Sequence, residues 1–374
     1  RFVERARHRQ AHLPEPRTLL LNPEVRTFRL TGGAIAGSVV FRGLAHLPRP
    51  PHGQFFGAPR TMAIRLRRQL KEGYKWGLRK AFLVGQRVGL DILPRHFYSS
   101  IPDLRELQTS SGWREPMSMI GVAGAGLDEQ LAFAGEIRAP LEDRLPGDVW
   151  PRAAEASGEP GYGVAEADCL YCFVASKRPR RIVQLGCGTS TAVILRAAAA
   201  AGYTPNLACI EPYPSAYLRR IDAAGQIELV PEKAQAVPLE RLTGLGEGDL
   251  LFVDSTHTVK VGSEVNRIIL EVLPRLAPGV YVQFHDIHFP YDYPRRLLET
   301  MFFATESTLL HAFLIGNHRY TIRLCLSMLH YERPEELRRL WPNYRPQKND
   351  QGLRASREGH FPSAIYLEVV DEAR

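Results

Sequence analysis

The sequence of 374 residues has few cysteines and no long apolar run. Five cysteines, an odd number, do not make a disulfide framework and favour a reducing compartment. Cys169 and Cys172 form a C-x-x-C pair, but without a second pair or nearby histidines they are more typical of one buried helix face than of a zinc site. No segment reaches the roughly 18 apolar residues of a membrane span, and no apolar signal segment is evident. We therefore predict a cytoplasmic protein.

The first 61 residues lack lysine, aspartate and methionine but contain ten arginines and three glutamates. They carry +7 of the formal net charge of +8, so the remaining chain is nearly neutral and gives no reason to expect a nucleic-acid partner. We interpret residues 1–61 either as a poorly ordered basic arm or as an upstream extension, with Met62 as the true start.

Residues 62–160 are predicted to form a mainly helical cap. Within it, residues 64–80 alternate apolar and basic side chains as an amphipathic helix does. Its basic side is either a solvated face or a site of weak attachment to a membrane surface or a partner. Leu93–Asp103 contains two prolines and many aromatic and polar groups, and it is either an active-site cover or a structural connector.

Residues 161–374 alternate short apolar strands with helices, which predicts a doubly wound, mostly parallel Rossmann-like sheet. The last two strands are expected to form an antiparallel, hairpin-like edge, with a charged loop over residues 332–360 between them. The expected strands cover residues 181–185, 207–210, 227–230, 249–253, 279–285, 320–328 and 364–370. The expected helices cover residues 168–177, 189–201, 215–224, 239–242, 263–272 and 294–316.

The stretch Val183–Thr191 joins an apolar strand to a helix through Gly186 and Gly188. Glycines at such a turn let the backbone approach a ligand closely, and the helix start offers free N–H groups. The next strand ends at Glu211, whose carboxylate can accept bonds from ribose hydroxyls. The combination predicts a nucleoside-binding site.

Two later strands each end with an aspartate and a histidine, Asp254 with His257 and Asp286 with His285. Because neighbouring parallel strands end at the same edge, we expect the two carboxylates to face each other and to bind Mg²⁺ or a similar ion. His257 is the first candidate for a general base, and His288 is a weaker one. In the alternative interpretation, the aspartates only cap loops and His285 is a core residue.

These motifs together resemble the class I S-adenosylmethionine-dependent methyltransferases. The similarity rests on Val183–Thr191, Glu211, Gly248–His257, Gly262–Asn266, Leu273–Val282 and His285–Pro294, and it covers roughly residues 75–371. The most similar branch is often encoded in polysaccharide and natural-product gene clusters, and Leu93–Asp103 also resembles its N-terminal motif.

The resemblance implies a cofactor site, a metal site and a base. Glu211 would bind the ribose, Gly186 and Gly188 the methionine part, and Glu232–Gln235 the adenine edge. The other positions implied for the cofactor are Gln184, Cys187, Ser190 and Asp254. Asp254, His285 and Asp286 would hold the divalent ion, and His257 would accept the proton.

The sequence departs from the family pattern where Gln184 replaces an acid that usually meets the cofactor's amino group, where Gln283 replaces a histidine and where His288 replaces a common aromatic residue. A neutral amide gives a weaker bond to a cation than a carboxylate does.

The function implied is methyl transfer from S-adenosylmethionine to a hydroxyl of a sugar or glycosylated natural product. The partner is then a small-molecule or saccharide acceptor, and an oligomer is possible. The alternatives are an inactive scaffold on the same fold, suggested by Gln184, and a metal-dependent hydroxylase, because Asp and His ligands also suit iron.

Overall fold

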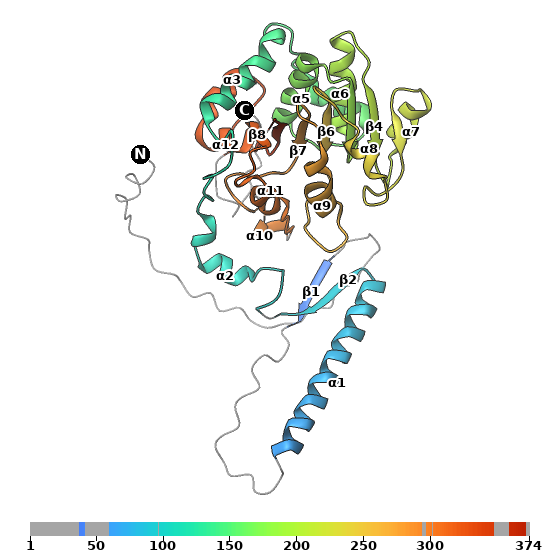
Figure 1. Cartoon of the computed structure of the whole chain (residues 1–374), viewed down its shortest axis with the longest axis vertical. Coiled ribbons are helices and arrows are strands. Elements are labelled where there is room, and N and C mark those ends of the chain that lie inside the picture. The colour runs from blue at the N-terminus through green and yellow to red at the C-terminus, as the bar shows by residue number, and fades with distance from the viewer. Residues whose placement is uncertain are drawn as a thin grey trace, which may run out of the picture. The chain divides into compact units, whose positions relative to one another are not determined.

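The structure is a computed structural model that describes residues 37–41, 60–95, 97–293, 297–300, 302–347 and 359–371. The chain divides into two compact units, Arg1–Ser100 and Ile101–Arg374, whose elements are labelled in Figure 1. Apart from residues 37–41 and 60–61, the basic arm predicted over residues 1–61 lies outside the described residues.

The first unit contains a two-stranded parallel sheet and one long helix. β1 (Gly37–Phe41) pairs with β2 (Leu90–Pro94), and α1 (Arg60–Arg87) precedes β2. The end of α1 packs closely onto β2, because a Cβ at Gly85 would lie only 2.5 Å from the carbonyl oxygen of Leu90.

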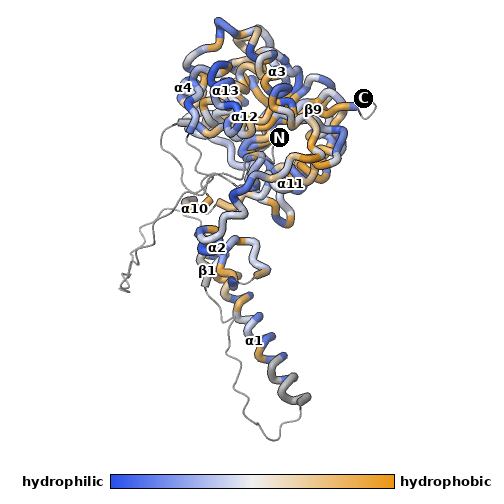
Figure 2. Tube along the Cα trace, turned by 90° about the vertical axis from the view of Figure 1, so that its left-hand side faces the viewer, coloured by the Kyte–Doolittle hydropathy of each residue, from blue (hydrophilic) through white to orange (hydrophobic). Residues whose placement is uncertain are grey.

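The helix α1 contains the amphipathic segment predicted over residues 64–80. Hydrophilic and hydrophobic residues alternate along it in Figure 2, and Leu70 and Trp76 are 66% and 65% exposed. None of the helices that the structure describes combines the length and the apolar character that a membrane span requires. Whether the basic side of α1 is only solvated or attaches to a surface or partner stays a prediction.

The second unit is built on a seven-stranded sheet with the order β5-β4-β3-β6-β7-β9-β8. All pairs are parallel except those of β9, which runs antiparallel to both β7 and β8. The prediction of a mostly parallel sheet with an antiparallel last strand is therefore confirmed. The strands are β3 (Arg181–Leu185), β4 (Asn206–Ile210), β5 (Glu228–Val230), β6 (Leu250–Val253), β7 (Tyr281–Phe284), β8 (Tyr320–Cys325) and β9 (Ile365–Val369).

Helices cover both faces of this sheet, as expected for buried parallel strands. The helices of this unit are α2 (Leu104–Thr109), α3 (Leu127–Arg138), α4 (Val149–Ser157), α5 (Val164–Lys177), α6 (Thr189–Ala200), α7 (Ala216–Ala223), α8 (Leu239–Thr243), α9 (Glu264–Arg267), α10 (Leu297–Thr300), α11 (Glu306–Leu314), α12 (Leu326–Glu332) and α13 (Pro334–Leu340). A π-helix, Ile268–Val272, continues α9, so the helix predicted over residues 263–272 is not a uniform α-helix.

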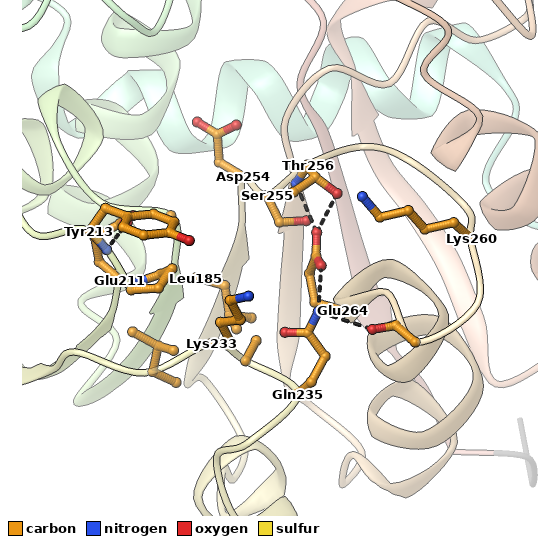
Figure 3. Close-up of a pocket in the computed structure, with 15 residues that line it drawn as sticks. Leu185, Glu211, Tyr213, Lys233, Gln235, Asp254, Ser255, Thr256, Lys260 and Glu264 are labelled. Carbon is orange, nitrogen blue, oxygen red and sulfur yellow. Dashed lines mark hydrogen bonds between the residues drawn. The ribbon is translucent and has the colours of Figure 1, made fainter. Parts of the chain in front are cut away.

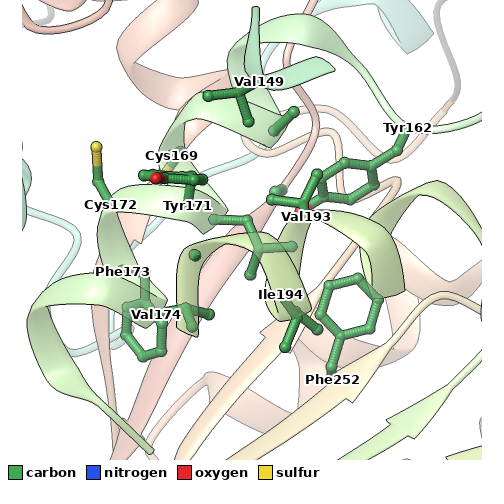
Figure 4. Packing of buried hydrophobic residues seen from close by; sticks show 14 of the residues in the cluster. Val149, Tyr162, Cys169, Tyr171, Cys172, Phe173, Val174, Val193, Ile194 and Phe252 are labelled. Carbon is green, nitrogen blue, oxygen red and sulfur yellow. The ribbon is translucent and has the colours of Figure 1, made fainter. Parts of the chain in front are cut away.

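The strands divide their side chains between two hydrophobic cores. Phe252 of β6 packs with α5 and α6, as Figure 4 shows, whereas the next residue, Val253, packs with α9 and α11. This alternation follows from the two-residue period of a strand. Because both faces of the sheet are buried, a ligand can reach the sheet only at the strand ends, where it contacts the residues that follow the strands.

Two predicted elements differ near the end of the chain. The helix predicted over residues 294–316 is interrupted between α10 and α11, because the N–H groups of Thr305 and Glu306 donate to the carbonyl of His257 (2.9 and 3.1 Å). Residues 294–296 and 301 lie outside the described residues.

The strand predicted over residues 320–328 ends at Cys325, where the side chain of Gln130 accepts the backbone N–H (2.9 Å) and α12 begins. The loop predicted over residues 332–360 contains α13, whose first turn has a proline and two glutamates and whose last turn has two arginines. Those residues are helix-terminus signals.

Gly124 fixes the segment before α3 to the edge strand β8. Its φ is +75°, and a Cβ there would overlap the backbone of Ile322. The N–H of Ile322 donates to the carbonyl of Ala123 (2.9 Å), which holds this edge of the sheet. Residues 101–160 therefore belong to the same packed unit as the sheet.

We expect Gly124→Ala to lower the free energy of unfolding by about 1–3 kcal/mol, because alanine must adopt a left-handed conformation and displace β8. Gly135→Ala is the matched control, since a Cβ at this position of α3 would meet nothing within 4 Å. It should raise stability by up to about 1 kcal/mol. Denaturant titrations measure both changes, and equal effects would contradict the close approach at Gly124.

Candidate functional site

The turn after β3 lies directly on the end of β6. Gly186 has φ of +78°, and a Cβ there would overlap the carbonyl oxygen of Asp254. The N–H of Gly186 donates to the carbonyl of Ile210 at the end of β4 (3.2 Å). No side chain fits at position 186, so the glycine allows three strand ends to meet at one place.

Gln184 lies beneath this turn and lines neither cavity described below. It is fully buried, and its Nε2 donates to the carbonyl of Gly186 (3.1 Å) and to Oγ of Ser190 (2.8 Å). Its Oε1 accepts from Oγ1 of Thr191 (3.0 Å). Both amide hydrogens are thus used inside the turn. The structure corrects the expectation that Gln184 meets a ligand, because its side chain points toward α6 and holds the turn together.

A cavity of about 490 Å³, called the larger cavity below, opens between the ends of β3, β4 and β6 (Figure 3). Its lining residues are Leu185, Gly186, Ile210, Glu211, Pro212, Tyr213, Lys233, Ala234, Gln235, Asp254, Ser255, Thr256, Lys260, Gly262 and Glu264. Of the segment Glu232–Gln235 predicted for this site, Glu232 does not line the cavity.

Glu211 stands at the boundary of this cavity with its carboxylate held in place. One oxygen accepts the N–H of Tyr213 (2.9 Å) and the other the N–H of Cys187 (3.4 Å). A carboxylate oxygen can accept more than one bond, so both oxygens retain capacity for hydroxyl groups of a ligand. The ribose role that the sequence suggested for Glu211 stays a prediction.

A smaller cavity of about 200 Å³ lies on the glycine side of Glu211. It is lined by Glu159, Gly161, Tyr162, Gly186, Cys187, Gly188, Thr189, Ser190, Glu211 and Asp254. Three of these residues, Glu159, Gly161 and Tyr162, come from the loop between α4 and α5. The two cavities share Gly186, Glu211 and Asp254.

The ends of β6 and β7 bring Asp254, His257, His285 and Asp286 together in what we call the carboxylate–histidine cluster. His257 Nε2 lies 3.3 Å from Asp254 Oδ1 and 3.6 Å from Asp286 Oδ2. His285 Nδ1 lies 3.3 Å from Asp254 Oδ1 and 3.7 Å from Asp286 Oδ1. His257 and Asp286 have φ of +56° and +55°, a strained conformation that occurs often at functional sites.

Two outer carboxylates, which sequence reasoning missed, support this cluster. Glu306 Oε2 lies 2.8 Å from His257 Nδ1, and Glu166 Oε1 lies 3.7 Å from His285 Nε2. Both glutamates are buried. Each imidazole therefore has one ring nitrogen toward the inner aspartates and the other toward an outer glutamate. Because both glutamates are far in sequence from the strand ends, no sequence pattern indicated these two contacts.

The charges of the cluster shift its pKa values strongly. Burial alone would lower the pKa of His257, but its bonds to Asp254 and Glu306 raise it to about 10. Burial acts the same way on His285, and the charges of Asp254 and Asp286 raise its pKa well above the usual value. Burial opposes ionisation of Asp254, yet the two imidazoles hold its pKa well below its usual value. The carboxylates therefore favour the protonated form of both rings.

Gln283 and His288 lie near this cluster and are both buried. The sequence departs from the family pattern at both positions. Gln283 donates through Nε2 to the hydroxyl of Tyr162 (3.2 Å). His288 stacks on Phe361 with ring centroids 5.9 Å apart. These contacts give both side chains a packing role beside the cluster.

Comparisons with known proteins give a family model and a relative that are similar to part of this chain. A family model described as a methyltransferase domain matches residues 183–287. The chain is 31% identical over 178 residues to an uncharacterized protein of Archaeoglobus fulgidus, and the match spans 44% of this chain and 78% of the relative.

The chain is also similar to two solved methyltransferase structures. One is SAH-bound and comes from Podospora anserina (14% identity, 64% of this chain and 88% of that chain, TM-score 0.35). The other comes from Geobacter sulfurreducens (19% identity, 41% of this chain and 79% of that chain, TM-score 0.28). Neither similarity bears on the substrate.

We expect Gln184→Glu to destabilise the protein by about 1–3 kcal/mol, because a carboxylate in place of the amide would face the carbonyl of Gly186 without a donor between them. Thermal unfolding at several pH values measures the change. Gln226→Glu is the control and should change stability less, because Gln226 is exposed and its side chain makes no hydrogen bond with the residues that the structure describes. A Gln184→Glu protein as stable as the wild type would show that the amide does not hold the turn.

Proposed function

Residues 183–287 form a methyltransferase domain and the protein is an S-adenosylmethionine-dependent methyltransferase, and from that premise we propose that its acceptor is a hydroxyl group of a sugar or a glycosylated natural product. We further propose that a divalent cation assists the transfer. The observation that carries both proposals is the position of Asp254, which lines both cavities and also belongs to the carboxylate–histidine cluster. A donor in the cavities and a hydroxyl at the cluster would thus be neighbours.

The lining of the two cavities fits the donor. S-adenosylmethionine supplies a methyl group that its sulfonium already activates. Glu211 would accept the ribose hydroxyls, and Tyr213 and Gln235 would border the adenine in the larger cavity. Gly186 and Gly188 would border the amino-acid part in the smaller cavity. The contribution of these residues is to position the donor.

The donor atoms of the cluster fit a divalent cation. Asp254, His257 and His285 each offer one ligand atom, and these atoms lie within 4.8 Å of one another. Metal-binding histidines commonly donate their second ring N–H to a carboxylate, which is the arrangement of His257 with Glu306. Mg²⁺ or a similar ion would supply charge that lowers the pKa of an adjacent hydroxyl.

His257 is placed to bind a cation as well as to act as the base that the sequence suggested. Either role needs Nε2 without its proton, so a cation bound there would displace the proton that the carboxylates around His257 favour. Its Nε2 also belongs to the same group of ligand atoms as Asp254 and His285. We therefore propose His257 as a third cation ligand. Asp286, with 35% of its side chain exposed, would then accept the hydroxyl proton.

An aromatic ring beside the cluster supports a sugar-like acceptor. Phe302 lies edge-on to His257 with ring centroids 6.4 Å apart and is 41% exposed. A sugar presents hydroxyl groups in one direction and an apolar C–H face in another, so a cation site next to an exposed aromatic ring suits both parts.

The scaffold alternative loses its original support. It depended on Gln184 being a weakened cofactor contact, but this side chain is used entirely within the turn. The hydroxylase alternative depends on which metal the cluster binds, so metal analysis separates it from methyl transfer.

We expect the purified enzyme to form S-adenosylhomocysteine from S-adenosylmethionine in the presence of a glycoside from an acceptor panel. Dialysis against EDTA should lower the rate at least tenfold, and Mg²⁺ or Mn²⁺ should restore it. An unchanged rate after chelation would refute cation assistance, and stoichiometric iron in protein purified without added metal would favour the hydroxylase.

The role of His257 can be tested by Mn²⁺ binding, measured by titration calorimetry or electron paramagnetic resonance. We expect His257→Asn to abolish tight binding and Glu306→Gln to weaken it roughly 10–100-fold, because the outer carboxylate orients the ring. Asp168→Asn is the control, since it changes a buried acid outside the cluster. If His257→Asn instead keeps Mn²⁺ affinity and loses only turnover, His257 is the base that the sequence suggested.

A further inference from the structure

One wall of the smaller cavity is acidic. Three carboxylate residues line it, Glu159, Glu211 and Asp254, and no lysine, arginine or histidine is among its described lining residues. Its other two ionisable residues, Tyr162 and Cys187, are neutral, because burial raises the pKa of each well above its usual value. Such a cavity favours a ligand group with positive charge.

Two of the three acids are already engaged. Glu211 accepts the backbone N–H groups of Tyr213 and Cys187, and Asp254 faces the imidazoles of the cluster. The side chain of Glu159 has no hydrogen bond or ion pair with any residue that the structure describes, and it is exposed. Glu159 is therefore the acid of this wall that remains available for a ligand.

The backbone of Glu159 is held at the start of α6. Its N–H donates to Oγ of Ser157 (3.2 Å), and its carbonyl accepts from Oγ1 of Thr189 (2.6 Å). The hydroxyls of Ser157 and Thr189 are themselves 3.1 Å apart. The carboxylate then lies over Gly188, where a Cβ would be only 2.5 Å from Glu159 Oε2. Glu159, a loop residue, is thus fixed above the glycine turn. Gln184, on the strand before that turn, points toward α6 instead.

We propose that Glu159 binds the α-ammonium group of the methyl donor and so replaces the acid that is missing at position 184. The inference rests on the proposed function, because it requires the donor to occupy both cavities. With the ribose at Glu211, the amino-acid end extends past the glycine turn into the smaller cavity. Its carboxylate then meets the first N–H groups of α6, and its ammonium meets Glu159.

The test compares two ligands by titration calorimetry. S-adenosylhomocysteine carries the α-amino-acid end, whereas 5′-methylthioadenosine shares the nucleoside and lacks that end. We expect Glu159→Gln to weaken S-adenosylhomocysteine binding roughly five- to tenfold, as the loss of a partly solvated charge-assisted bond does. Binding of 5′-methylthioadenosine should change less than twofold.

Glu155→Gln is the matched control, because Glu155 is an exposed glutamate on α4 that pairs with Arg152 and lines neither cavity. It should leave both affinities unchanged. An unchanged S-adenosylhomocysteine affinity in Glu159→Gln, or an equal loss for both ligands, would overturn the role of Glu159 and leave the proposed function intact. A wild-type protein that binds neither ligand would overturn the proposed function itself.

Discussion

The close approach of the β3 turn to the end of β6 is the constraint on which the site depends. Only glycine fits at position 186, because any Cβ would overlap the carbonyl oxygen of Asp254. The contact fixes Asp254 between two cavities and at the edge of the carboxylate–histidine cluster. If the turn moved outward to admit a side chain, the floor of both cavities and the position of Asp254 would change together.

The cluster itself has an excess of negative charge. Two imidazoles face four carboxylates when the outer glutamates, Glu166 and Glu306, are counted. Even with both rings protonated, the two positive charges do not balance the four carboxylates. Burial also raises the pKa of Glu306. A buried imbalance of this sign is costly without a compensating cation. The same imbalance raises the pKa of both rings, so a cation bound there would compete with the ring protons.

Much of the fold could be predicted because local sequence determines it. The apolar strand at residues 181–185 and the helix after the glycine turn follow from short patterns, and the strand ends placed Asp254 near Asp286 by topology alone. The interruption of the helix predicted over residues 294–316 could not be predicted, because His257, some 50 residues earlier, caps the start of α11. Contacts between distant segments also explain why the outer glutamates were missed.

Gln184 shows most clearly why sequence position does not determine a side chain's role. Its place before the glycines suggested a weakened ligand contact, but the direction of its amide is set by Ser190 and Thr191, which follow it on α6. A carboxylate at this position would have no donor for the carbonyl of Gly186, so the amide suits this set of partners. An acid for the ligand must then come from another segment. The loop before α5 is the segment that packs over the turn, and Glu159 is its acid.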